Sequence, residues 1–192
     1  VPGLYAPNEA GQIMRNWFAS DGNDADNDLI RGTVAAISAI TQAPLFLKNQ
    51  ANTLRIARIE RIFSFPRLLL LRRDLRWTAQ SLLLARRRLL ADDRRWWSVA
   101  PPGYEEILRE EPIYQVLWQA DRLEKIALDA CLSAPQRAAV IDYEALCENP
   151  SATLAGLADR FGLRRSGRLA QPLSKSNNRR LTGREWSRLE AI

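Results

Sequence analysis

The four consecutive leucines at residues 68–71 constrain the fold of this chain more than any other feature of its sequence. Pro66 and Arg67 precede the run, and Arg72 ends it. A short, uninterrupted apolar run of this kind is typical of an interior strand in a parallel sheet, because helices cover both faces of such a strand. The leucine run therefore predicts a parallel sheet.

Two other short apolar segments, residues 44–47 and residues 138–143, predict two more strands. Apolar residues at helical spacing predict helices between and around them. Strands that alternate with helices of this length predict an α/β fold, and 192 residues fit a single domain over residues 1–192. The predicted helices are residues 9–20, a stretch through Ala35 and Ile40, and residues 52–63, 75–90, 105–131, 150–161 and 185–192.

The composition excludes several classes of protein. Hydrophobic residues make up 46% of the chain and charged residues 26%, which excludes a disordered chain. No uncharged apolar run approaches the roughly 18 residues that a membrane span needs. Cys131 and Cys147 have no CxxC spacing, which favours a reducing compartment over a zinc site or a disulfide scaffold.

The chain contains no histidine. This excludes Ser-His-Asp and Cys-His catalysis, histidine-ligated metals and a histidine general base. A base in this protein must therefore be a carboxylate, a lysine or a tyrosine. The net charge is +6, and 25 of the 28 basic residues are arginines, the side chain that binds phosphate and carboxylate groups bidentately. An anionic ligand would explain the arginines, and a GC-rich genome is the alternative explanation.

The residues that follow the leucine run suggest a phosphate site. Arg73, Asp74 and Arg76 come directly after the predicted strand, and Ser81 lies eight residues after Arg73 on the predicted helix 75–90. In open parallel sheets, ligands bind at the carboxyl ends of the strands, where a guanidinium group and a helix start can hold a phosphate. The alternative is a helix cap followed by solvated charges.

Four segments occur in a characteristic order along the chain: Lys48 with Asn52, Phe65-Pro66, Arg73-Asp74-Leu75-Arg76 with Ser81, and residues 141–150 (Ile-Asp-Tyr-Glu-Ala-Leu-Cys-Glu-Asn-Pro). This order resembles the sulfotransferase superfamily, most closely its bacterial and carbohydrate-type branch, over residues 8–180. The resemblance implies a P-loop-NTPase-like three-layer sandwich. It also implies transfer of a sulfuryl group from 3′-phosphoadenosine 5′-phosphosulfate to a hydroxyl or amine of a saccharide, a glycolipid or a small alcohol. No metal and no nucleic-acid partner is implied, and we expect a cytoplasmic, bacterial protein.

The same resemblance implies the residues that bind the donor nucleotide. Arg73 and Ser81 would bind its 3′-phosphate, with Arg76 beside them, and Tyr143 would approach the adenine. Leu75 replaces the proline that is usual in the family, which removes turn rigidity but no binding group. The alternative for Tyr143 is a half-buried tyrosine at the end of a strand.

Two residues are implied near the reacting atoms. Lys48 follows the predicted strand 44–47 in a Lys-x-x-x-Asn setting, although Gln50 replaces the common proline. Glu9 lies where carbohydrate sulfotransferases carry a catalytic glutamate, and it is the candidate general base. The alternatives are a lysine whose stem covers apolar surface and a first-turn glutamate that stabilises the helix dipole.

The sequence departs from the family pattern near both ends. Arg179 and Arg180 lie in a segment similar to the one that closes over the nucleotide phosphates, but its glycines are absent, and a solvated basic linker is the alternative. The family's Gly/Ser/Thr-rich phosphosulfate loop has no counterpart. We therefore expect the chain as given to begin after the first βα unit and to be inactive alone. A non-catalytic protein of the same fold and an arginine-rich nucleic-acid-binding module are the alternative functions. The acceptor and the oligomeric state stay open.

Overall fold

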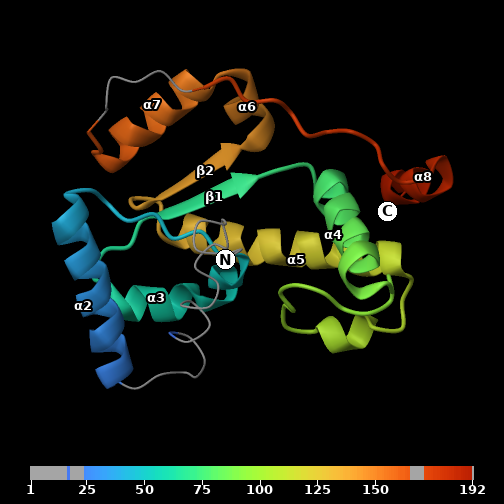
Figure 1. Ribbon diagram of the computed structural model, residues 1–192, viewed down its shortest axis with the longest axis horizontal. Helices are drawn as coiled ribbons and strands as arrows, with labels where there is room; N and C mark the ends of the chain where they lie inside the picture. The colour runs from blue at the N-terminus through green and yellow to red at the C-terminus, as the bar shows by residue number, and fades with distance from the viewer. Residues whose placement is uncertain (1–16, 18–23, 165–170, 192) are drawn as a thin grey trace, which may run out of the picture. The chain divides into compact units, whose positions relative to one another are not determined.

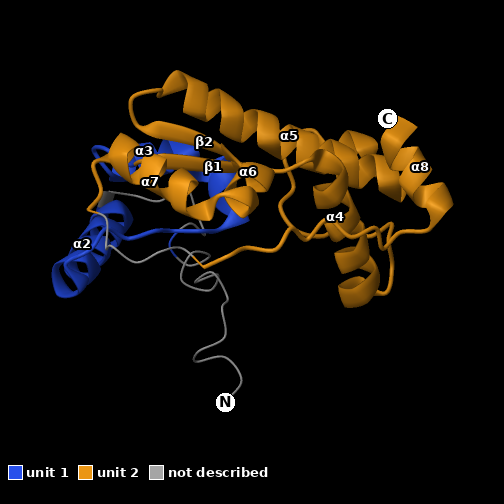
Figure 2. Ribbon diagram, turned by 90° about the horizontal axis from the view of Figure 1, so that it is seen from above, with its two compact units in different colours: residues 1–66 blue, residues 67–192 orange. Residues whose placement is uncertain are grey.

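The computed structural model describes Trp17 and residues 24–164 and 171–191. The chain divides into two compact units, Val1–Pro66 and Arg67–Ile192, which Figure 2 shows in different colours. Whether both units belong to one domain stays a prediction. No helix within the described ranges is long and apolar enough to cross a membrane.

The first unit contains helix α2 (Asp24–Thr41), the 3₁₀ helix η1 (Gln50–Arg55) and helix α3 (Ile56–Ile62). Hydrogen bonds join α2 to α3, because Arg31 Nε donates to the Ile62 carbonyl over 2.8 Å and the Arg58 guanidinium donates to Asn27 Oδ1. The sequence predicted a helix through Ala35 and Ile40, which α2 confirms. The predicted helix 52–63 is confirmed only in its second half, where α3 follows the 3₁₀ turn.

The predicted strand at residues 44–47 is wrong. Residues 44–49 form neither helix nor strand. The Leu45, Phe46 and Leu47 side chains are 38%, 64% and 38% exposed. A short apolar run specifies a strand only where a neighbouring strand pairs with it. The predicted helix 9–20 lies outside the described residues apart from Trp17.

The second unit contains a two-stranded parallel sheet flanked by helices, which confirms the α/β class (Figure 1). Strand β1 (Leu68–Arg72) pairs with strand β2 (Ala138–Asp142) in a register that places Leu68 opposite Ala138 and Arg72 opposite Asp142. Both strands were predicted, but the interior position expected for residues 68–71 is wrong: within the described residues β1 pairs with β2 alone, and its Leu69 and Leu71 side chains are 43% and 49% exposed. The helices of this unit are α4 (Leu75–Leu90), α5 (Pro112–Ser133), α6 (Tyr143–Glu148), α7 (Pro150–Phe161) and α8 (Gly183–Ala191), with a 3₁₀ turn η2 (Tyr104–Ile107) before α5.

Helices cover opposite faces of this sheet. Ala139 on β2 packs with Leu157 and Phe161 of α7. Arg72 is on the other face, because side chains alternate along a strand, and it forms an ion pair with Glu124 of α5 over 2.8 Å. A larger core joins α4, α5 and α8: Ala79, Leu82, Leu83, Ile113, Val116, Ala120, Leu181, Trp186 and Leu189.

Local signals explain where these helices begin and end. Asp74 caps α4 by accepting from the Arg76 backbone N–H over 2.9 Å, and the predicted helix 75–90 is confirmed. The predicted helix 105–131 is instead a 3₁₀ turn followed by α5, because Pro112 lacks the N–H that a helix interior uses and fits the first turn. Gly162, at φ 61°, ends α7 as predicted.

Candidate functional site

Arg73 follows β1 directly, at the carboxyl end of the sheet. Its Nη2 donates to the Ser176 carbonyl oxygen and, over 2.9 Å, to Asn177 Oδ1. Its guanidinium carbon lies 4.8 Å from the centre of the Tyr143 ring, a cation–π distance. The Nε of Arg73 is buried and has no hydrogen-bond partner among the residues that the structure describes. The predicted 3′-phosphate residue and the predicted adenine residue therefore contact each other.

Tyr143 begins α6 immediately after β2, so both residues come from the carboxyl ends of adjacent parallel strands. Its hydroxyl accepts from the Ser176 backbone N–H over 3.0 Å and donates to the Ser174 carbonyl over 3.4 Å. We call residues 171–181, which have no regular secondary structure and lead into α8, the strap. The strap crosses the site because Tyr143 and Arg73 both bind its backbone.

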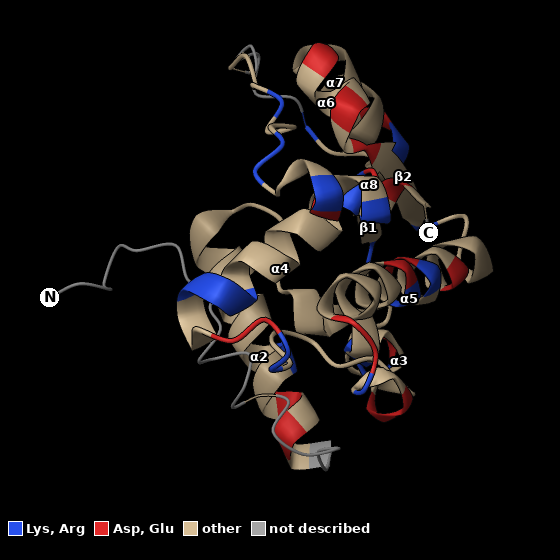
Figure 3. Ribbon diagram, turned by 90° about the vertical axis from the view of Figure 1, so that its right-hand side faces the viewer, with Lys and Arg blue, Asp and Glu red and all other residues tan. Residues whose placement is uncertain are grey.

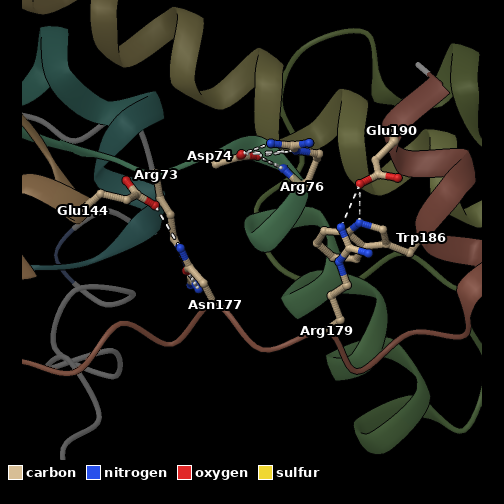
Figure 4. A network of polar contacts seen from close by, with 8 residues as sticks. All are labelled: Arg73, Asp74, Arg76, Glu144, Asn177, Arg179, Trp186 and Glu190. Atoms are coloured by element: carbon tan, nitrogen blue, oxygen red, sulfur yellow. Dashed lines mark hydrogen bonds and ion pairs between the residues drawn. The ribbon is translucent and has the colours of Figure 1, made fainter.

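Asn177 of the strap bridges two charged side chains. Its Oδ1 accepts from Arg73, and its Nδ2 donates to Glu144 Oε1 over 3.3 Å (Figure 4). Nearby, Lys175 of the strap pairs with Glu148 at the end of α6. The described contacts of Arg73 are thus with a carbonyl, an amide and an aromatic ring, and none is with a carboxylate.

Carboxylates do bind the other two predicted arginines shown in Figure 4. Arg76 forms a forked ion pair with Asp74. The hydrogen bond from Arg76 holds the pKa of the Asp74 carboxyl below its usual value, and the same bond raises the pKa of Arg76. Arg179 lies 4.8 Å from the Trp186 ring centre and pairs with Glu190 over 3.1 Å. Both arginines thus bind a carboxylate directly, whereas the described hydrogen bonds of Arg73 are with uncharged groups and its charge acts on the Asp74 carboxylate without a hydrogen bond.

The remaining predicted site residues have different surroundings. Ser81 is exposed on α4, and its hydroxyl donates to the Trp77 carbonyl one turn earlier rather than to Arg73. The Arg180 side chain is exposed, while its backbone N–H donates to Gln80 Oε1 over 2.7 Å. Lys48 is exposed in the first unit, and it follows irregular chain instead of the predicted strand. Glu9 lies outside the described residues.

Gln80, Asn177 and Glu144 were not among the predicted site residues, although Asn177 and Glu144 lie in segments that carry the family resemblance. Glutamine and asparagine are mostly exposed in proteins and bind any backbone, so their types carry no signal of a role in this site. Glu144 directly follows Tyr143, and that position was the one available hint. Within the described ranges, no three Cys, Asp or Glu side chains are grouped so that they could hold a metal ion.

This arrangement can bind an anion next to a planar ring. Arg73 supplies a cation, and Tyr143 supplies an aromatic ring beside it. In comparisons with known proteins, no family model, no curated protein and no solved structure matches the chain.

Proposed function

We propose that this chain forms part of a sulfotransferase of P-loop-like α/β architecture that uses 3′-phosphoadenosine 5′-phosphosulfate. One observation carries the proposal. Arg73, Tyr143 and the strap come from three distant parts of the sequence and form one network at the carboxyl ends of β1 and β2. The family resemblance implies that these three segments surround one end of the donor nucleotide.

The chemistry of Arg73 suits a phosphate. In open α/β sheets ligands bind outside the carboxyl ends of the strands, where Arg73 lies. A guanidinium whose hydrogen bonds are with uncharged groups keeps more of its attraction for an incoming anion than Arg76 and Arg179, which are already paired with carboxylates. We therefore propose that Arg73 binds the 3′-phosphate. Arg76, Arg179 and Arg180 then belong to the surroundings of that site. Ser81 would have to turn its hydroxyl away from the Trp77 carbonyl to bind the same phosphate.

In the proposed reaction an acceptor hydroxyl attacks the sulfur in line and the bond from sulfur to the phosphate oxygen breaks. The sulfuryl group moves to the acceptor, adenosine 3′,5′-bisphosphate leaves, and a general base takes the hydroxyl proton. Glu9 is our candidate for the base, and Lys48 is our candidate to stabilise charge on the transferring group. Arg73 binds a part of the donor that does not react, so it contributes to donor affinity and orientation.

Calorimetry of the 192-residue chain tests the assignment of Arg73. We expect adenosine 3′,5′-bisphosphate to bind more tightly than adenosine 5′-phosphate. Arg73→Ala should weaken binding of the bisphosphate by about 2–3 kcal/mol, as expected for a lost charge-assisted contact. It should weaken binding of the monophosphate much less.

Arg122→Ala is the matched control, because it removes the same charge from an exposed position on α5. It should change both affinities little. A parent protein that does not prefer the bisphosphate, or equal losses for both nucleotides in Arg73→Ala, would overturn the proposed function.

A further inference from the structure

Gln80 of α4 holds the backbone of the strap with both polar atoms of its side chain. Its Nε2 donates to the Asn178 carbonyl over 2.9 Å, and its Oε1 accepts from the backbone N–H groups of Arg180 and Leu181 over 2.7 and 3.2 Å. Gln80 is only 3% exposed, so water cannot readily replace these bonds. Three hydrogen bonds thus fix residues 178–181 to α4.

The fixed residues are next to those that contact Arg73. Asn177 and Ser176 directly precede Asn178, and adjacent Cα atoms are about 3.8 Å apart, so a fixed position at Asn178 limits where they can lie. On the other side, Leu181 is buried in the core of α4, α5 and α8. The position of α4 therefore determines, through the strap, where the Ser176 and Asn177 oxygens that accept from Arg73 lie.

Arg73 depends on such external support. An arginine side chain has many rotamers, and ordering it is costly unless packing and hydrogen bonds select one. Its Nη2 is held by Ser176 and Asn177, and its guanidinium lies against the Tyr143 ring. Removing the strap would leave the ring alone to orient the group.

We propose that Gln80 is a positioning residue of the nucleotide site. It fixes the strap, and the strap then holds the Arg73 guanidinium in the orientation that selects a nucleotide with a 3′-phosphate. This inference rests on the proposed function, and it goes beyond it by making selectivity depend on a buried glutamine that need not touch the nucleotide.

The Gln80→Met variant tests this dependence, because methionine has nearly the same length and cannot form the three hydrogen bonds. The measurement is the ratio of the dissociation constants for adenosine 5′-phosphate and adenosine 3′,5′-bisphosphate, with thermal unfolding recorded in parallel. We expect the preference for the bisphosphate to fall roughly tenfold, since small displacements of a binding group are costly. The affinity for the monophosphate should stay nearly constant.

Two further variants separate positioning from general stability. Gln119→Met removes another buried glutamine, one that binds the Trp97 and Val99 carbonyls away from the strap, so it should lower stability without changing the preference. Gln80→Glu keeps the acceptor for Arg180 and Leu181 but turns a carboxylate oxygen, in place of the donor, toward the Asn178 carbonyl. It should also reduce the preference, and it carries the test if Gln80→Met does not fold.

Hydrogen exchange gives a readout without any nucleotide. The Ser176 N–H is bonded to Tyr143 and not to Gln80, so its exchange should accelerate in Gln80→Met or Gln80→Glu only if Gln80 holds the whole strap. Unchanged exchange at Ser176, or an unchanged bisphosphate preference in these variants, would overturn the role of Gln80. A parent protein that has no such preference would instead overturn the proposed function.

Discussion

Arg86 is a fully buried arginine on α4 whose described hydrogen-bond partners are all uncharged. Its Nη1 donates to Gln115 Oε1 over 2.7 Å and to the Asp93 carbonyl over 3.2 Å, and its Nη2 donates to Gln119 Oε1 over 3.3 Å. Burial lowers the pKa of this guanidinium. The two glutamines then donate to carbonyls of residues 97–110, so one buried cation organises the connection between α4 and α5.

At the scale of single residues, we expect Gln115→Met to destabilise the protein strongly. The change removes the shortest hydrogen bond of Arg86 and leaves the Leu108 and Glu110 carbonyls without their donor. Uncompensated buried polar groups predict a loss of about 3 kcal/mol in the free energy of unfolding, measured in urea. Gln136→Met, at an exposed position, should cost less than about 0.5 kcal/mol. Similar values for the two variants would contradict the role of the buried network.

At the scale of elements, α8 begins with a capping box. Glu185 Oε2 accepts from the Thr182 backbone N–H over 2.9 Å, and the Glu185 N–H donates to Thr182 Oγ1 over 3.3 Å. The same carboxylate pairs with Arg87 of α4 over 2.6 Å. The hydrogen bond from Arg87, followed by those from Thr182, lowers the pKa of Glu185 to about 2. This residue therefore both starts α8 and attaches it to α4.

The stability that Glu185 contributes should depend on pH. Its folded pKa lies below its unfolded value of 4.5, so the contribution is present above 4.5 and is lost as the pH falls toward about 2. Glu185→Gln should lower the free energy of unfolding by about 1 kcal/mol at pH 7, because the partly exposed pair with Arg87 is screened by solvent. Urea unfolding should show the difference from the parent shrinking between pH 4.5 and 2.

Glu106→Gln, at an exposed position in η2, is the control for this charge change and should change the free energy of unfolding at pH 7 by less than about 0.5 kcal/mol. A Glu185→Gln variant whose deficit stays constant down to pH 2 would show that the carboxylate is not the cause.

At the scale of the whole molecule, the net charge of +6 permits non-specific attraction of nucleic acid. Many arginines are nevertheless paired with carboxylates, including Arg72 with Glu124, Arg87 with Asp93 and Glu185, and Arg188 with Glu111. Figure 3 shows basic and acidic positions next to each other along α5. Mixed charges of this kind attract nucleic acid less strongly than a separate basic face does.

Duplex DNA should therefore bind weakly and in a strongly salt-dependent way. We expect fluorescence anisotropy to show at least a tenfold loss of affinity between about 50 and 200 mM salt, because released counterions supply the binding free energy. Binding of adenosine 3′,5′-bisphosphate should depend on salt less steeply. A sequence-specific, nanomolar complex with DNA at physiological salt would favour the nucleic-acid-binding alternative instead.

The sequence predicted those features that depend on residues close together in the chain. The leucines at 68–71 form a strand as predicted, although Leu69 and Leu71 are 43% and 49% exposed, and Asp74 begins the helix 75–90 because its side chain caps the next turn. Gly162 ends α7 because it adopts a positive φ without strain.

The roles of residues whose partners lie far away in the sequence became known only from the tertiary structure. The apolar segment 44–47 has the composition of a strand, but a strand needs a pairing edge, which the sequence of the segment does not encode. The role of Gln80 likewise depends on the strap, about 100 residues later, passing over it. Contacts at such separation are set by how helices and strands pack. The family resemblance implied that Arg73 and Tyr143 lie at one nucleotide, but the bond from Arg73 to Asn177 was seen only in the folded chain.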